Sequence, residues 1–250
     1  MYNVITKYRN LDIVTYSRYY YYNNNVILDN HDVDLDNVMS GKSFLLKAIR
    51  KTFPASVCVR AFSRKLLLES KLLFINGLLY EDLLFSISAF LYANRVVQIS
   101  DALHYYRKGN LNSITNTISK KDIDVLKSVR YIEDLITKTN NEDLINFNFW
   151  NEFIFKWVSN ATLFKYPIKK FFSIQGWRNC RLIKKDPIFA KYIKKVAFSS
   201  KTTRYVRISA LLIYYNLFVF YCVRKITRPF LRMNKKHRSM PVSAIDKVSI

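Results

Sequence analysis

The alternation of apolar and polar positions in the first third of the chain predicts strands and helices in alternation. Residues 11–16 are β-branched and aromatic and predict a strand that residues 17–22 continue, and residues 26–28 predict a hairpin partner after a run of three Asn. Further helices are predicted after Ser40, ending before Pro54, and over residues 64–70. Residues 82–93 lack Gly and Pro and are rich in Leu, Ile, Phe and Ala, which predicts a buried helix.

The pattern after residue 118 is helical throughout. Residues 122–138 have apolar positions at helical spacing, residues 139–142 form a polar break, and residues 143–164 predict a second helix rich in Phe and Trp. A turn is predicted around Gln175 and Gly176, and a basic, aromatic helix over residues 187–198. The predicted fold class is α/β for residues 1–118, followed by a mainly α-helical region over residues 119–250.

Residues 208–223 form a stretch of 16 residues without a charge, bounded by basic residues on both sides. A membrane-spanning helix needs about 20 residues, so this stretch is too short to predict one. The sequence leaves two alternatives for it, an interfacial helix or a helix buried in a protein core.

Positive charge is concentrated in the last third of the chain. The formal net charge is +23, and residues 163–250 contain 21 Lys and Arg but only two Asp. Seven basic residues and no acidic one lie between Arg224 and Arg238, among Phe230, Leu231 and Met233. A polybasic segment after an apolar helix is typical of a peripheral anchor on an anionic membrane, and no nucleic-acid-binding motif accompanies it. We therefore expect a membrane surface and not a nucleic acid as the partner.

The scarce residue types exclude several classes of site. The chain has only four Gly, and neither a P-loop nor a Gly-x-Gly-x-x-Gly pattern occurs. Its three cysteines, Cys58, Cys180 and Cys222, are far apart and odd in number, and no secretory signal precedes them. These features predict a reduced, cytoplasmic setting.

An acidic pair, Glu81 and Asp82, lies at the first turn of the helix predicted over residues 82–93. Acidic side chains at this position cap the free N–H groups of the first turn and suit the helix dipole. A carboxylate at a cleft can instead take a proton from an attacking hydroxyl group. Position alone favours capping and leaves both alternatives open.

The residues around this pair resemble a known family. A basic, aromatic segment over residues 59–74, a Gly before Glu-Asp, a helix, a short strand, and Tyr105-Tyr106-Arg107 followed by Asn112-Ser113-Ile114 are similar to the second half of the catalytic domain of bacterial family 2 glycosyltransferases. These enzymes have the GT-A fold, and the resemblance extends from about residue 57 to residue 117.

The resemblance implies roles for five residues. Asp82 would be the catalytic base and Glu81 its support, while Tyr106 and Arg107 would lie on the donor side of the cleft, where a cation can meet a diphosphate. His104 is a candidate substrate or metal contact, although a half-buried, packed ring is the more common role of such a residue.

The function implied is transfer of a sugar from a nucleotide-sugar donor to a lipid-linked or saccharide acceptor. The process would be surface polysaccharide biosynthesis, at the inner face of the cell membrane. The alternative is a catalytically inactive, membrane-associated interaction module that keeps only the acceptor half of such an enzyme.

The family also implies a divalent cation, Mn²⁺ or Mg²⁺, held by an Asp-x-Asp motif. Residues 29–36 contain four Asp and one His, but only 28 residues precede them, so we favour a solvated loop. By the resemblance, the nucleotide-binding strands and the metal ligands would lie before residue 1 and are absent from this chain. Arg60, Arg64 and Lys65 could contact phosphate, but solvated surface positions are the favoured interpretation.

Overall fold

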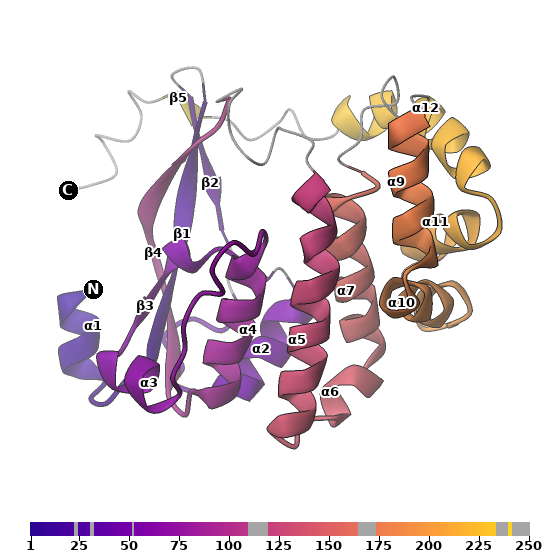
Figure 1. Cartoon of the computed structure of the whole chain (residues 1–250). Coiled ribbons are helices and arrows are strands. Elements are labelled where there is room, and N and C mark those ends of the chain that lie inside the picture. Colours follow the sequence, from indigo (N-terminus) through magenta and orange to yellow (C-terminus); the bar gives the residue numbers. More distant parts are fainter. Residues whose placement is uncertain are drawn as a thin grey trace. The chain divides into compact units, whose positions relative to one another are not determined.

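The computed structural model describes residues 1–22, 25–30, 33–51, 53–109, 120–164, 174–233 and 240–241. The chain divides into two compact units, which are described separately (Figure 1). Unit 1 contains residues 1–76, 81–111 and 236–250, and unit 2 contains residues 77–80 and 112–235. The predicted boundary at residue 118 lies outside the described residues.

Unit 1 is built on a mixed sheet (Figure 1). Its strands are β1 (Ile13–Tyr22), β2 (Asn25–Asp29), β3 (Arg60–Phe62), β4 (Val96–Arg107) and β5 (Met240–Pro241). The central strand is β1, which pairs in parallel with β4 and antiparallel with β2 and β3, while β5 pairs with β2. The predicted β1–β2 hairpin is confirmed. The strand after the acidic pair was expected to be short, but β4 has 12 residues because its pairing with β1 continues to Arg107.

Two of the four helices of unit 1 begin at a serine that caps them. They are α1 (Tyr2–Lys7), α2 (Gly41–Arg50), α3 (Arg64–Glu69) and α4 (Glu81–Tyr92), with a 3₁₀ turn η1 (Val57–Val59). Ser40 and Ser63 cap α2 and α3 by accepting hydrogen bonds from the backbone. A Cβ atom at Gly41 would lie only 2.0 Å from the carbonyl oxygen of Phe90, so only glycine permits this close approach of α2 to α4.

Every described element of unit 2 is helical. They are η2 (Lys120–Ile123), α5 (Asp124–Lys138), α6 (Asp143–Asn146), α7 (Asn148–Ala161), α9 (Ile174–Lys185), α10 (Pro187–Ala197), α11 (Arg204–Tyr215) and α12 (Leu217–Met233). A buried hydrogen-bond network joins three of them. Trp150 Nε1 on α7 donates to Tyr192 Oη on α10 (3.3 Å), and this hydroxyl donates to Glu133 of α5 (2.5 Å). Burial of Tyr192 raises the pKa of its hydroxyl group. The hydroxyl group therefore keeps its proton and remains a hydrogen-bond donor at neutral pH.

Three sequence predictions in the helical region are wrong. Residues 208–223 form parts of two helices and not one, because Asn216 is extended and its side-chain oxygen accepts hydrogen bonds from the N–H groups of Phe218 and Val219, which starts α12. Residues 143–164 are likewise divided at Phe147, whose backbone is extended between α6 and α7.

The turn predicted at Gln175 and Gly176 is also wrong, because both residues lie within α9. Glycine costs a helix about 1 kcal/mol relative to alanine. Burial of Cys180 and Ile183 on the same helix offsets that cost.

At the level of fold class, the sequence prediction is confirmed, since a mixed α/β region is accompanied by a helical region. Within the described parts of the chain, no helix has the length and apolar character that crossing a membrane requires. The three cysteines are free, with Cys180 buried and Cys58 exposed.

Candidate functional site

The acidic pair follows directly on a strained residue. Tyr80 has a φ angle of 67°, a left-handed conformation that is rare for a bulky side chain. Its hydroxyl lies within hydrogen-bond distance of the Asp122 carboxylate (3.2 Å) and the Ala161 carbonyl (3.1 Å), both in unit 2 like Tyr80 itself. Tertiary hydrogen bonds therefore anchor the side chain of Tyr80, the residue that precedes α4 in the sequence.

Asp82 is half-buried at the start of α4, and the pKa of its carboxyl group is raised. Burial is the largest cause and the neighbouring charge of Glu81 the second, while a hydrogen bond from the backbone of Val57 and the charge of Arg60 act in the opposite direction. The backbone hydrogen bond to this carboxylate thus comes from η1, outside α4. A carboxylate with a raised pKa accepts a proton more readily than an exposed one, which is what a general base requires.

Arg60 is a buried cation, with only 5% of its surface exposed. Its guanidinium donates to the carbonyls of Ser56 and Pro54 and to Ser86 Oγ, and burial lowers its pKa to about 9. The interpretation of Arg60 as a solvated surface charge is therefore wrong, because β3 turns this side chain into the core of unit 1. Arg64 and Lys65, by contrast, are exposed as expected.

Two charged residues shift the pKa of Arg60 in opposite directions. Asp82 raises the pKa of Arg60 and Arg18 lowers it, in addition to the larger effect of burial. Asp82 and Arg18 therefore act on one buried group, although they are 64 positions apart in the sequence.

Arg18 is the centre of a cluster of aromatic and charged side chains on β1, β2, β4 and the residue after β4, called the sheet cluster below. Its members are Arg18, Tyr20, Asp29, His104, Tyr106 and Lys108. Arg18 forms an ion pair with Asp29 (2.8 Å), donates to Tyr20 Oη (2.6 Å) and lies 5.7 Å from the centre of the Tyr106 ring. Lys108 lies over the rings of Tyr20 (4.4 Å) and Tyr106 (4.9 Å).

Desolvation changes the acid–base properties of this cluster. Burial raises the pKa of Tyr20 to about 12, and burial together with the charge of Arg18 lowers the pKa of Lys108. The cluster therefore presents cations against aromatic faces in a partly dehydrated setting, where charge–charge and cation–π attractions are stronger than in water.

The predicted donor-side residues do not all share this cluster. Tyr106 and His104 do, with their ring centres 6.4 Å apart, and His104 is half-buried. Arg107 follows Tyr106 in the same strand, so its side chain points to the opposite face, where Tyr105 stacks on Tyr19 (5.0 Å). The structure thus brings Tyr106 and His104 to Arg18 and directs Arg107 away from them.

The sequence interpretation missed Arg18, Tyr20 and Lys108. A signal was present, since Arg18 and Tyr20 alternate on one strand as His104 and Tyr106 do on another, with Lys108 two positions further on. What the sequence did not contain was the parallel pairing of β1 with β4, which places Arg18 opposite His104 and Tyr20 opposite Tyr106.

Two of the described carboxylates of residues 29–36 are already paired with cations. Asp29 is paired with Arg18, and Asp34 is paired with Lys47 (2.5 Å), whose hydrogen bond lowers the pKa of Asp34. His31 and Asp32 lie outside the described residues. Across the described ranges, no three His, Cys, Asp or Glu side chains are grouped as metal ligands.

Two comparisons with known proteins were negative: no family model matches the chain, and no curated protein matches its sequence.

Proposed function

We propose that the chain is a glycosyltransferase that moves a sugar from a nucleotide-sugar donor to an acceptor hydroxyl group, with Asp82 as the base. One carboxylate oxygen of Asp82 takes the hydroxyl proton while the acceptor oxygen forms a bond to the anomeric carbon. The bond from this carbon to the diphosphate breaks, and the nucleoside diphosphate leaves with the electron pair. Glu81 supports the step electrostatically, because its charge raises the pKa of Asp82.

The observation that carries this proposal is the electrostatic link through Arg60. Both Asp82 and Arg18 act on the pKa of Arg60, and Arg18 lies against Tyr106. Two groups that the family resemblance assigns to one catalytic domain, Asp82 and Tyr106, are thus connected through two arginines. Arg60 is buried and acts as a positioning residue for Asp82.

The sheet cluster has the chemistry that a nucleotide-sugar donor needs. Cations stabilise the charge that develops on a leaving diphosphate, and aromatic faces pack against sugar rings. Lys108 and Tyr106 are our candidates for these contacts, with His104 beside them. Arg107, exposed on the opposite face, takes no part in this proposal, and no step depends on a metal.

The acceptor in this proposal is lipid-linked, and the chain acts as a peripheral protein on the inner face of the cell membrane. Large apolar side chains of α11 and α12 are exposed, among them Ile208 (46%), Phe218 (49%) and Ile226 (68%). Exposed cations, Arg204 and Lys225, lie on the same two helices. An apolar surface with basic residues around it suits an anionic lipid interface.

Transfer assays with a panel of nucleotide sugars and lipid-linked acceptors, each with and without Mn²⁺, test the proposal. Asp82→Asn should lower the rate by about 100-fold or more, the typical contribution of a general base. Asp101→Asn, at an exposed position of β4, is the control and should leave the rate unchanged. Equal rates for wild type and Asp82→Asn would exclude Asp82 as the base. Absence of transfer by the folded wild type would favour the inactive interaction module.

Pelleting with vesicles tests the membrane part of the proposal. Binding to vesicles of anionic lipid should exceed binding to neutral vesicles and should fall as salt is added, because the attraction of exposed cations is screened. Binding that changes with neither lipid charge nor salt concentration would contradict the membrane part of the proposal.

A further inference from the structure

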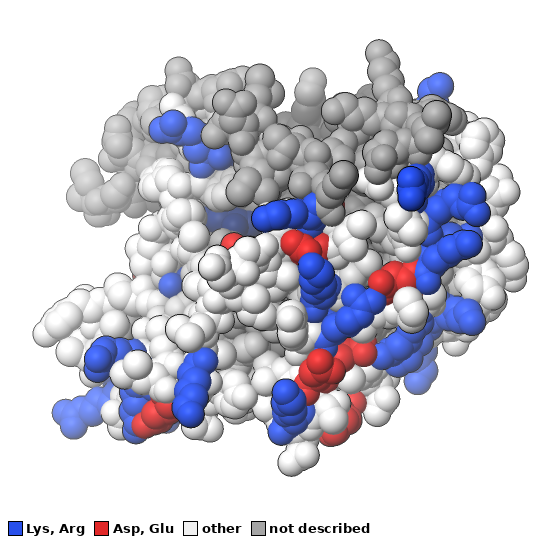
Figure 2. All heavy atoms as spheres, in the orientation of Figure 1, with Lys and Arg blue, Asp and Glu red and all other residues white. Residues whose placement is uncertain are grey.

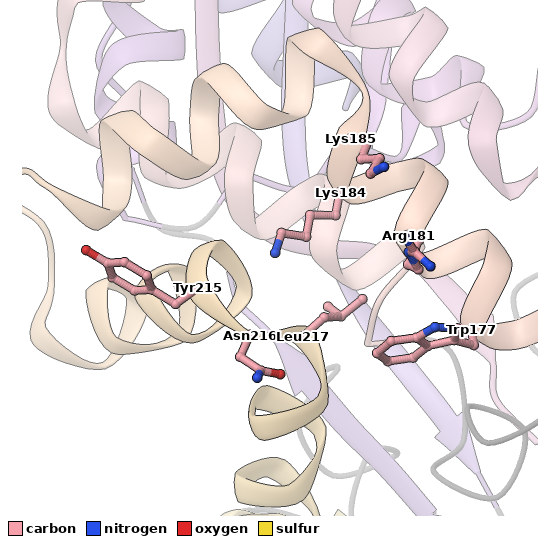
Figure 3. Close-up of a pocket in the computed structure, with 7 residues that line it drawn as sticks. All are labelled: Trp177, Arg181, Lys184, Lys185, Tyr215, Asn216 and Leu217. Atoms are coloured by element: carbon pink, nitrogen blue, oxygen red, sulfur yellow. The ribbon is translucent and has the colours of Figure 1, made fainter.

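Unit 2 contains a pocket between α9 and the junction of α11 with α12 (Figure 3). Its volume is about 310 Å³, at the lower end of the range of about 300–1,000 Å³ that is typical of small-molecule sites. The lining residues are Trp177, Arg181, Lys184, Lys185, Tyr215, Asn216 and Leu217. The break at Asn216 creates this pocket, because a continuous helix over residues 208–223 would have no junction here.

Three of the lining residues are cations, and no acidic residue lines the pocket. Among the described residues, no carboxylate lies within ion-pair distance of Arg181, Lys184 or Lys185. The Asp that follows them, Asp186, is paired with Arg130 (2.5 Å).

Other cations of unit 2 do have acidic partners. Lys191 pairs with Glu133 and Lys156 with Glu152, and Figure 2 shows acidic side chains among the Lys and Arg of this unit. The uncompensated charge of the pocket is therefore a local property and not only a result of the basic composition.

The position of Lys184 is unfavourable without an anion. Its side chain is half-buried, and desolvation lowers its pKa. Arg181 and Lys185 add like charges nearby. In Figure 3, Lys184 extends toward the side of the pocket formed by Tyr215 and Asn216. A bound anion would compensate the desolvation of Lys184.

The remaining wall of the pocket is apolar and aromatic. Trp177 and Leu217 lie on the other side of the pocket from Tyr215 in Figure 3. An indole face provides stacking and apolar contact, which an inorganic ion cannot use. The lining thus suits a ligand that carries a compact negative charge next to an aromatic or apolar group.

We propose that this pocket binds a phosphate ester, with the phosphate held by Arg181 and Lys184 and the organic group packed against Trp177. Phosphate fits better than carboxylate, because a dianion matches several cations and a guanidinium can donate to two phosphate oxygens at once. The ester could be a soluble metabolite or a lipid headgroup, which share this chemistry. The proposal concerns unit 2 and does not rest on the proposed function.

Titration of the full chain with phenyl phosphate, inorganic phosphate and benzyl alcohol tests the ligand class. Calorimetry measures the affinity, and tryptophan fluorescence locates the site, because the Trp177→Phe variant should lose the fluorescence change. Phenyl phosphate should bind more tightly than either of the other probes, which each lack one half of the ligand. Equal affinity for phenyl phosphate and inorganic phosphate would overturn the assignment of the organic group to Trp177.

Charge-removing variants test the residues. Arg181→Gln and Lys184→Gln should each weaken phenyl phosphate binding about tenfold, the effect expected for loss of a charge-assisted hydrogen bond. Arg178→Gln is the matched control, since Arg178 is an exposed cation of α9 that does not line the pocket, and it should change the affinity less than about twofold. An equal effect of all three variants would mean that only the overall charge matters and would overturn the proposal.

Vesicles distinguish the two sources of the ester. If the ligand is a lipid, phosphatidic acid vesicles should retain the wild type more strongly than vesicles of equal charge made with phosphatidylglycerol, and Lys184→Gln should remove this preference. If the ligand is a soluble metabolite, Lys184→Gln should weaken phenyl phosphate binding without changing the preference for phosphatidic acid vesicles. Failure of Lys184→Gln to change either measurement would overturn the proposal and would leave the role of Asp82 in transfer unaffected.

Discussion

Arg18 in unit 1 differs from the pocket-lining cations of unit 2 in how its charge is compensated. Arg18 of unit 1 is 13% exposed in its side chain and is held by Asp29, Tyr20 and Tyr106. Arg181 and Lys184 of unit 2 line a pocket that has no acidic residue. A cation that is already paired positions its neighbours, whereas an uncompensated cation is available for an external anion. We therefore assign a positioning role to Arg18 and a binding role to Arg181 and Lys184.

Removing one cation of each kind should change the free energy of unfolding by very different amounts. Arg18→Met should lower the free energy of unfolding by about 2 kcal/mol, because the largely buried Asp29 loses its ion pair. Lys184→Met should change it by less than about 0.5 kcal/mol, because none of the described carboxylates pairs with this residue. Urea unfolding followed by circular dichroism measures both. If Lys184→Met lowers the free energy of unfolding as much as Arg18→Met does, the two cations do not differ in the way proposed.

A smaller effect on the free energy of unfolding is expected at Tyr80, the residue directly before the acidic pair. Tyr80→Phe removes the hydroxyl that contacts Asp122 and Ala161, and we expect a loss of about 1 kcal/mol in the free energy of unfolding. If the strained backbone of Tyr80 positions Asp82, the variant should also change the pKa of Asp82. Tyr131→Phe, at an exposed position of α5, is the control and should change neither quantity.

The smallest effect is the pH dependence of stability that Asp82 causes. Its folded pKa is raised above the unfolded value of about 4, so between these two values the folded state binds more protons than the unfolded state. The free energy of unfolding of the wild type should therefore rise relative to that of Asp82→Asn as the pH falls through this window. Urea unfolding of both proteins at several pH values measures the difference. A difference that changes in the opposite direction would mean that the folded pKa is depressed.

Local sequence signals were sufficient for most of unit 1. The helix predicted after Ser40 begins at that residue, and the apolar run after Asp82 forms the buried helix α4. These features depend on hydrogen bonds and packing within a few residues, which the sequence displays directly.

The features that sequence could not predict depend on long-range contacts. Arg60 has the appearance of a surface residue, and only the folded position of β3 reveals that it is buried beneath Phe53 and Phe90. The parallel pairing of β1 with β4 likewise joins segments about 85 residues apart. The break at Asn216 is locally encoded, since Asn is a good N-cap, but a single polar residue in an apolar run is also compatible with one continuous helix.

The pKa of Asp82 is the most direct test of the central claim, that unit 1 prepares this carboxylate to accept a proton. Carbon-13 NMR titration of the carboxyl group in the wild type and in Glu81→Gln gives the value. We expect a pKa above the ordinary range of aspartate in the wild type, and a lower one in Glu81→Gln because the neighbouring negative charge is removed. A pKa at or below the ordinary value in the wild type would contradict the account.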